Sequence, residues 1–445
     1  MSTLPTSQGA QKPHGLMRIL GLGFGLAVII GSTLGIGILR APGLVAGQIH
    51  TTGGILLVWL VGGLYTLLGA ICFIELGTAL PEAGGYYVYA RRAFGPLTGF
   101  AVGWTDWLTY CTVLGYVSIG IGEFSSGLLP FGEDVAKSIA IVALGAFGVL
   151  QWTGVRTSSR FQEVTTAVKF VAFLLLVGAC LVHPRFPSSG VALPAGGAFA
   201  GLVFALQAVA ITYGGWQSAL YFSEEDRDTT KNLPRSMIGG VLSVIVVYLL
   251  VNLALLATLP IPTIAQSKLP AADAAAVVFG EFGGRAILIL SLLSLLPLLN
   301  AILMIGTRIL FAMGRDGLLF PGGAKVNSRG TPARANFVTI GIACVLVLAA
   351  DFQKLVGIAS FFLALNYCIC CVALMVLRVR EPELPRPFRT WGYPYTAVIV
   401  LLGAAAFLYG TFVGDTRTAL VATGLLAAGL AGRVLMDRVR VRAAG

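Results

Sequence analysis

Charged residues are scarce in this 445-residue chain: they make up 11% of it, whereas hydrophobic residues make up 57%. A soluble domain carries about 25% charged residues, so little of this chain's surface can face water. Histidine is also rare, with three residues, all at or beyond the ends of apolar runs. With so few ligands available we expect no metal site.

The chain also lacks the glycine-rich loop ending in Lys and Ser or Thr that ATP-driven pumps require. Its seven cysteines all lie within apolar runs, where buried small hydrophobes are the favoured interpretation. A metal or redox site at Cys368, Cys370 and Cys371 is the alternative, although no His or acidic residue stands beside them. We therefore predict that the protein is not an enzyme and has no cofactor and no disulfide framework.

Apolar runs near the length that crosses a bilayer, about 20 residues, recur along the whole chain. They predict an all-α polytopic membrane protein whose main surroundings are the lipid bilayer, preceded by a disordered cytoplasmic tail at 1–16. Twelve transmembrane helices are expected, at 17–46, 54–79, 95–129, 135–153, 160–182, 198–222, 235–259, 284–314, 333–350, 353–378, 391–413 and 416–437.

Basic residues give the chain a net charge of +11. They punctuate the apolar runs and cover no single face, so we expect no nucleic-acid partner. If the N-terminus is cytoplasmic, 22 of the 30 lysines and arginines fall on the cytoplasmic side. That excess predicts that both termini are cytoplasmic.

Glycines interrupt the first predicted helix at mid-membrane depth. Gly31, Gly35 and Gly37 surround Ser32 and Thr33, and these residue types weaken a helix. A break would expose amide groups at the start of a second half-helix, an end that suits a carboxylate. Close helix packing through Gly31 and Gly35 is the alternative.

The sixth predicted helix is interrupted in a corresponding place. Gly214 and Gly215 lie between Tyr213 and Trp216 in the middle of the segment. Glycine-interrupted helices at matching positions of two halves are a pointer to a transporter's binding site. This match favours a break in helix 1 over a packing motif.

Several stretches, in order along the chain, resemble a known family: 31–38 (GSTLGIGI), 80–89 (LPEAGGYYVY), 94–96 (FGP), 103–104 (GW), 213–216 (YGGW), 224–225 (EE), 231–235 (KNLPR), 313–317 (MGRDG) and 386–389 (RPFR). The set is similar to the amino acid–polyamine–organocation superfamily, most of all to its L-amino-acid transporter branch. The resemblance implies two inverted five-helix repeats, at 17–183 and 197–380, with broken helices 1 and 6. Two further helices at 391–438 complete the implied fold.

The resemblance also implies the site. The substrate's carboxylate would meet helix 1 at Gly31, Ser32, Thr33, Gly35, Ile36 and Gly37. Its ammonium would meet backbone carbonyls of helix 6, where the expected binding residues are Ile211, Thr212, Tyr213 and Gly214. The family often has an aromatic gate where Ile211 stands, so Tyr213 or Trp216 would have to compensate, or the gate is looser.

Lys169 lies about ten residues into helix 5, where a charge is costly unless paired or wetted. In the resembled family a lysine here takes the place of a coupling sodium ion, so we expect a coupling role; a prop for helix 1 is the alternative. We expect Glu75, Asp106, Glu123 and Glu163 to reach headgroup water, with roles in the path as the alternative. The run 224–235 is expected to be a solvated inner loop, with gate closure as the alternative.

The predicted function is secondary transport of L-amino acids across the cytoplasmic (inner) membrane by alternating access. Transport is expected to be sodium-independent, by exchange or proton coupling. A carrier of polyamines or other organocations and a channel-like facilitator are the alternatives. Some family members bind a partner through a cysteine in the loop after helix 3; this chain has none near 130–137, so no disulfide-linked partner is expected.

Overall fold

The computed structural model describes residues 16–128, 135–182, 198–319 and 324–444, so the predicted tail at 1–16 lies almost wholly outside it. Its first half contains α1 (Leu22–Thr33), α2 (Gly37–Ala46), α3 (Thr52–Ala79), α4 (Tyr86–Phe94), α5 (Pro96–Leu128), α6 (Ala136–Trp152) and α7 (Val155–Val182). The rest contains α8 (Ala198–Thr212), the 3-10 helix η2 (Trp216–Glu225), α9 (Thr229–Thr258), α10 (Ile261–Gln266), α11 (Pro270–Phe279), α12 (Glu281–Arg315), α13 (Ala333–Ala349), α14 (Phe352–Arg380), α15 (Tyr395–Gly414) and α16 (Thr416–Ala444).

Seven of the described helices are long and apolar enough to cross a membrane. The pair α1 and α2, bent by 45°, would make an eighth span. The helices α6 and α13, with 17 residues each, are shorter than the usual spanning length of about 20. The chain is therefore a nearly all-helical, multi-pass membrane protein.

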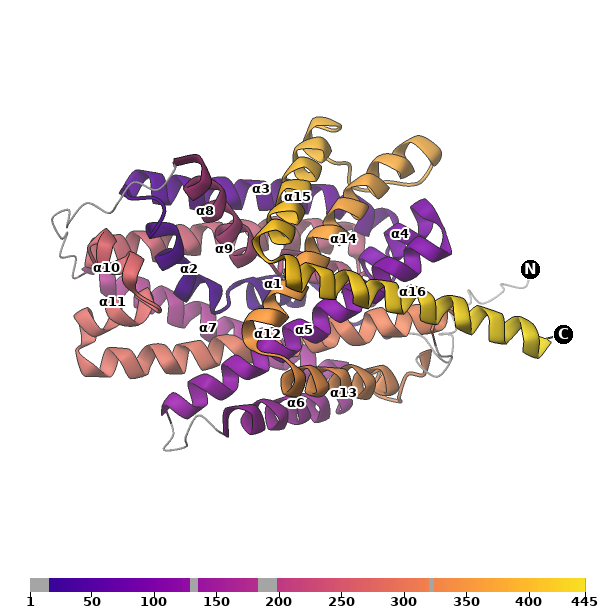
Figure 1. The fold of residues 1–445 in the computed structure, drawn as a ribbon, viewed down its shortest axis with the longest axis horizontal. Helices are drawn as coiled ribbons and strands as arrows, with labels where there is room; N and C mark the ends of the chain where they lie inside the picture. The colour runs from indigo at the N-terminus through magenta and orange to yellow at the C-terminus, as the bar shows by residue number, and fades with distance from the viewer. Residues whose placement is uncertain (1–15, 129–134, 183–197, 320–323, 445) are drawn as a thin grey trace, which may run out of the picture.

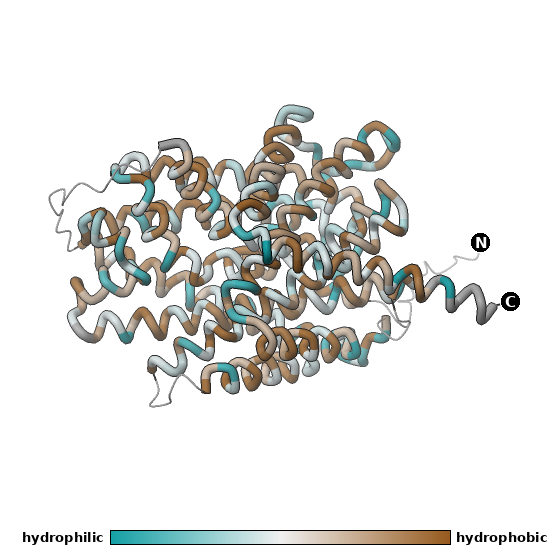
Figure 2. The backbone as a smooth tube through the Cα atoms, viewed as in Figure 1, coloured by the Kyte–Doolittle hydropathy of each residue, from teal (hydrophilic) through white to brown (hydrophobic). Residues whose placement is uncertain are grey.

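The long helices α7, α9 and α12 pack around α1 (Figure 1). The helix α2 instead packs against α8 and the short helices α10 and α11. Hydrophobic residues run along the long helices, and many of the hydrophilic ones lie in the connections (Figure 2). The first half of the broken helix, α1, thus stands at the centre of the bundle, whereas α2 lies beside the short helices α10 and α11 (Figure 1).

The connection between α9 and α12 contains the short helices α10 and α11. Each has a proline in its first turn, where a missing N–H costs nothing. A Cβ on Gly43 of α2 would lie 2.8 Å from the carbonyl oxygen of Ser267 and 3.0 Å from that of Ile264. The loop therefore sits directly on the second half of the broken helix.

Two of the four membrane acids do not reach water, so that expectation is wrong for Glu75 and Asp106, which are 1% and 0% exposed. Glu75 accepts hydrogen bonds from the Arg378 guanidinium at 2.8 and 2.6 Å and from the Thr390 N–H at 2.6 Å. Its partners lie some 300 residues away in sequence, which is why local pattern could not reveal them. Glu123 and Glu163 are exposed.

The run 224–235 is only partly solvated, which corrects the expectation for its first residues. Glu225 and Arg308 of α12 are both fully buried, and the guanidinium donates to the two carboxylate oxygens at 2.8 and 3.1 Å. Arg308 also lies over the ring of Phe222, 5.4 Å from its centroid. This ion pair fixes the end of η2 to α12.

Candidate functional site

The break in the first helix begins at Thr33, where α1 ends, and closes at Gly37, where α2 starts. The Ser32 hydroxyl donates to the Val28 carbonyl at 2.6 Å, a bond that often accompanies a helix bend. The Thr33 hydroxyl is buried and has no hydrogen-bond partner. The first N–H groups of α2 lack partners within their helix and carry partial positive charge.

The second break separates α8, which ends at Thr212, from η2, which starts at Trp216. The Gly214 N–H donates to the Ile211 carbonyl at 3.0 Å. Gly215 has a φ of 117°, a conformation that L side chains rarely adopt. Both glycine-marked interruptions predicted from the sequence are therefore real breaks in the helices.

The two breaks touch each other. A Cβ on Gly215 would lie 2.7 and 2.8 Å from the carbonyl carbon and oxygen of Ser32, and 2.9 Å from the N of Thr33. A Cβ on Gly37 would lie 3.0 Å from the Thr212 methyl carbon. Backbone atoms from residues about 180 positions apart thus form one small polar region in a largely apolar bundle.

Tyr248 of α9 joins the two breaks. Its hydroxyl is buried and lies 2.6 Å from the Thr33 carbonyl oxygen and 2.9 Å from the Thr212 carbonyl oxygen, the donor facing both acceptors. The sequence interpretation missed this residue. A tyrosine and Asn252 four residues later, inside an apolar helix, were the signal that could have revealed it.

Lys169 of α7 is fully buried beside the first break. Its ammonium donates to the Gly31 carbonyl at 2.9 Å and to the Ser294 carbonyl of α12 at 3.1 Å. This contact with helix 1 fits both a coupling role and a prop, so the coupling role remains a prediction. Carbonyl dipoles stabilise the charge here, in place of a carboxylate.

Polar residues near Lys169 hold α1 to its neighbours. Gln162 and Thr166, on the same face of α7, donate to the Ala27 carbonyl at 3.3 and 3.1 Å. Asn300 of α12 in turn donates to the Gln162 side-chain oxygen at 2.9 Å. The spacing of residues 162, 166 and 169 marks one face of a helix and was a missed sequence signal.

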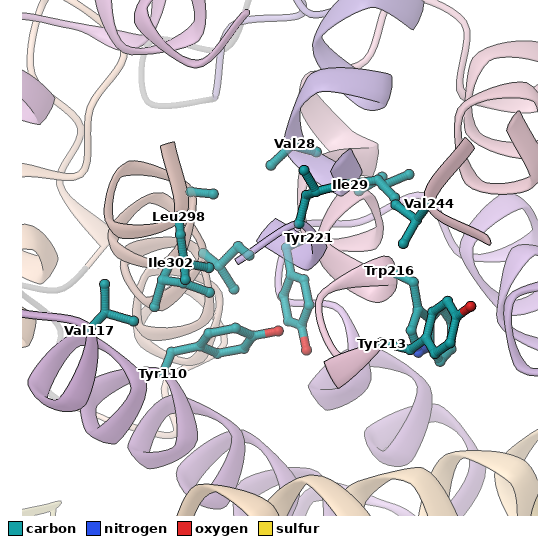
Figure 3. Packing of buried hydrophobic residues seen from close by; sticks show 14 of the residues in the cluster. Val28, Ile29, Tyr110, Val117, Tyr213, Trp216, Tyr221, Val244, Leu298 and Ile302 are labelled. Carbon is teal, nitrogen blue, oxygen red and sulfur yellow. The ribbon is translucent and has the colours of Figure 1, made fainter. Parts of the chain in front are cut away.

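The structure does not bring every predicted residue to the space between the breaks. Tyr213 donates its hydroxyl to the Trp59 carbonyl at 3.1 Å and packs on Tyr248, with ring centroids 4.8 Å apart. Trp216 packs on Phe73, with centroids 5.3 Å apart. These residues belong to the buried cluster of Figure 3, whereas Ile211 is 45% exposed; its place as a gate is untested.

A cavity of about 290 Å³ lies between α3, α8, α14 and α15. Its wall is mostly apolar, with Tyr65, Thr66, Gln207 and Tyr367 as polar members. Of the predicted site residues, Trp216 alone lines it, so this cavity is distinct from the region between the breaks.

Residues 25–428 match the amino acid permease family. The serine/threonine exchanger SteT of Bacillus subtilis is 28% identical, over 92% of this chain and 94% of the relative. The Asc-type amino acid transporter 1 of Homo sapiens is 29% identical over 86% and 76%. The large neutral amino acids transporter small subunit 2 of Mus musculus is 30% identical over 87% and 76%. The chain therefore belongs to the amino acid permeases of the amino acid–polyamine–organocation superfamily and is a membrane transporter, not an enzyme.

Proposed function

We propose that this permease carries L-amino acids across the cytoplasmic membrane by alternating access, as an exchanger that does not use sodium. The observation that carries the proposal is the contact between the two breaks, where Gly215 meets the backbone of Ser32 and Thr33. The relatives' names, which include a serine/threonine exchanger and neutral amino acid transporters, support the substrate class and exchange.

The polarity of the two breaks suits a zwitterion. The substrate's carboxylate binds at the start of α2, where N–H groups of Ile36 and Gly37 are near the positive end of the helix dipole. The unpartnered Thr33 hydroxyl is a further donor for it. The substrate's ammonium binds carbonyls at the end of α8, near Ile211 and Thr212, where the helix dipole is negative.

Lys169 supports sodium independence. A sodium site needs several oxygen ligands, and here the carbonyls of Gly31 and Ser294 already accept hydrogen bonds from the Lys169 ammonium. A cation bound at these oxygens would meet the Lys169 ammonium about 3 Å away, a repulsion that is strong in a low-dielectric interior. The ammonium makes the contacts with these carbonyls that a bound sodium ion would otherwise make, and it remains part of the protein throughout transport.

The proposed topology is twelve spans with both termini in the cytoplasm. The clear spans are fewer, so the proposal adds α5, α6, α13 and the pair of α8 and η2 to them. The proposed inverted repeats place the α1–α2 break and the α8–η2 break in corresponding helices. The excess of Lys and Arg in alternate connections supports this orientation.

Uptake into proteoliposomes tests the proposal. Vesicles preloaded with an unlabelled amino acid should take up labelled amino acid faster than empty vesicles, and replacing sodium with choline should leave the rate unchanged. A strict sodium requirement would remove the coupling part of the proposal. Transport of polyamines but not of amino acids would favour a carrier of polyamines or other organocations. Flux that does not saturate would favour a channel-like facilitator.

A further inference from the structure

Asp106 is a fully buried carboxyl group in the membrane-spanning bundle. It lies ten residues into α5, roughly 15 Å from the start of that helix. Its two oxygens accept a hydrogen bond from the hydroxyl of Tyr221, which is 3.1 Å from Oδ1 and 2.9 Å from Oδ2. Tyr221 belongs to η2, so this bond links α5 to the second half of a broken helix.

Within the described residues no lysine, arginine or histidine pairs with Asp106, whereas Glu75 and Glu225 each have an arginine. The titratable groups that face it are phenols and one thiol: Tyr110 on its own helix, Tyr221 on η2, Tyr86 on α4, and Tyr367 and Cys370 on α14. The surroundings of this carboxyl therefore supply hydrogen-bonding hydroxyls and no compensating positive charge.

The hydroxyl groups around Asp106 are incompletely satisfied. The buried Ser218 hydroxyl of η2, three residues before Tyr221, has no hydrogen-bond partner. The phenol of Tyr110 interacts with Tyr221 and Gln217, and that of Tyr86 with Tyr367. The Tyr110 and Tyr221 rings lie 5.3 Å apart, and their hydroxyl ends lie close together in Figure 3. Unpaired buried hydroxyls are costly, so this cluster is suited to a state in which water or a rearranged bond reaches it.

A carboxylate without a cation is strongly disfavoured in such an interior, because burying an isolated charge costs far more than burying a hydrogen-bonded neutral acid. The neutral acid keeps the Tyr221 bond and can itself donate to a neighbouring oxygen. Once η2 moves and water enters, the anion becomes tolerable. The protonation state of Asp106 is thus tied to the position of η2.

The position of Tyr221 is fixed by its neighbours. A Cβ on Gly85, which has a φ of 55°, would lie 2.5 Å from the Tyr221 ring, and the Tyr86 ring lies 5.7 Å away. The other end of η2 starts at Trp216, next to the Gly215 contact with the first break. Tyr221 therefore lies on the 3-10 helix that begins at the second break.

We infer that Asp106 is a proton-binding site and that the Asp106–Tyr221 bond is a proton-dependent latch between α5 and η2. This latch makes the rate of amino acid exchange depend on pH; the inference rests on the proposed function. The protonated acid holds the latch closed. When the latch opens, the acid releases its proton to water and becomes a carboxylate, and it must regain a proton before the latch closes again.

Exchange in proteoliposomes from about pH 5 to about pH 8 tests the latch. The expected wild-type rate changes with pH, and Asp106→Asn, which keeps the size and stays neutral, loses that dependence. Asp273→Asn on α11, an exposed carboxyl, keeps the wild-type profile. Tyr221→Phe, which keeps the ring and removes the hydroxyl, moves the midpoint of the profile; an unmoved midpoint would overturn the latch even if the Asp106 variant did not fold.

An infrared difference spectrum between wild type and Asp106→Asn shows whether Asp106 is protonated, and it requires no transport measurement. The expected result at neutral pH is loss of the carbonyl band of a protonated carboxylic acid; loss of a carboxylate band instead would refute the site. A wild type that exchanges amino acids at a pH-independent rate also refutes the latch and leaves the proposed function intact. A wild type that moves no amino acid refutes the proposed function, and the infrared band then decides on Asp106.

Discussion

Replacing Gly215 with alanine places one methyl group in the contact between the two breaks. The backbone there has a φ of 117°, and the new carbon would lie 2.7–2.9 Å from backbone atoms of Ser32 and Thr33. A non-glycine residue in such a region costs about 1–3 kcal/mol. The overlap adds to this cost because both of its partners are backbone, which cannot rotate away.

We take about 2 kcal/mol, the middle of that range, as the penalty on the state in which the breaks touch. That penalty lowers the population of the state by roughly 30-fold. Exchange by Gly215→Ala should fall accordingly, together with the melting temperature of the purified protein. The matched control is Gly341→Ala in α13, where an added carbon meets nothing within 4 Å, so alanine should be neutral or stabilising by up to about 1 kcal/mol.

If Gly215→Ala exchanged amino acids at the wild-type rate and melted at the wild-type temperature, as Gly341→Ala is expected to do, the close contact would be refuted. A fall in exchange without a fall in melting temperature would place the effect in the transport cycle alone. Both results can be read from the same purified samples, with the labelled substrate as the only added reagent.

Three further predictions concern buried polar partners. Lys169→Met leaves the buried Gly31 carbonyl without its ammonium donor, at about 1–3 kcal/mol for an unsatisfied group, and should abolish exchange; unaltered exchange would reduce the lysine to a prop. Tyr248→Phe removes the hydroxyl shared by the two breaks and should weaken amino acid binding while the ring still packs, measured as a higher KM; an unchanged KM would exclude a role at the site. Arg308→Ala leaves a buried Glu225 unpaired and should destabilise by about 3–5 kcal/mol, read from the melting temperature; a loss as small as that of a surface pair would contradict the buried geometry.

The sequence predicted the breaks because their cause is local. Glycine, serine and threonine at 31–37 and the glycine pair at 214–215 weaken a helix wherever they occur in it, and α1 and α8 end within a few residues of those positions. The sequence did not predict that helix 6 continues as the 3-10 helix η2. The hydrogen-bond pattern of η2 depends on its packing against α1, α3, α9 and α12.

The partners of buried charges could not be predicted from pattern. Glu75 and Arg378, or Glu225 and Arg308, meet only after the chain has folded, because 303 and 83 positions separate them. End-of-helix acids were therefore expected to reach water. The contacts of Tyr248 likewise depend on two carbonyls that meet only in the folded chain, although its place four residues before Asn252 in an apolar helix was a local signal.

A structure determined with a bound amino acid tests the central claim most directly. The account predicts density between the breaks, with the carboxylate against the N–H groups at the start of α2 and the ammonium against carbonyls at the end of α8. Density with the opposite polarity would contradict the dipole argument. An amino acid bound instead in the cavity between α3, α8, α14 and α15, with the space between the breaks empty, would contradict the site itself.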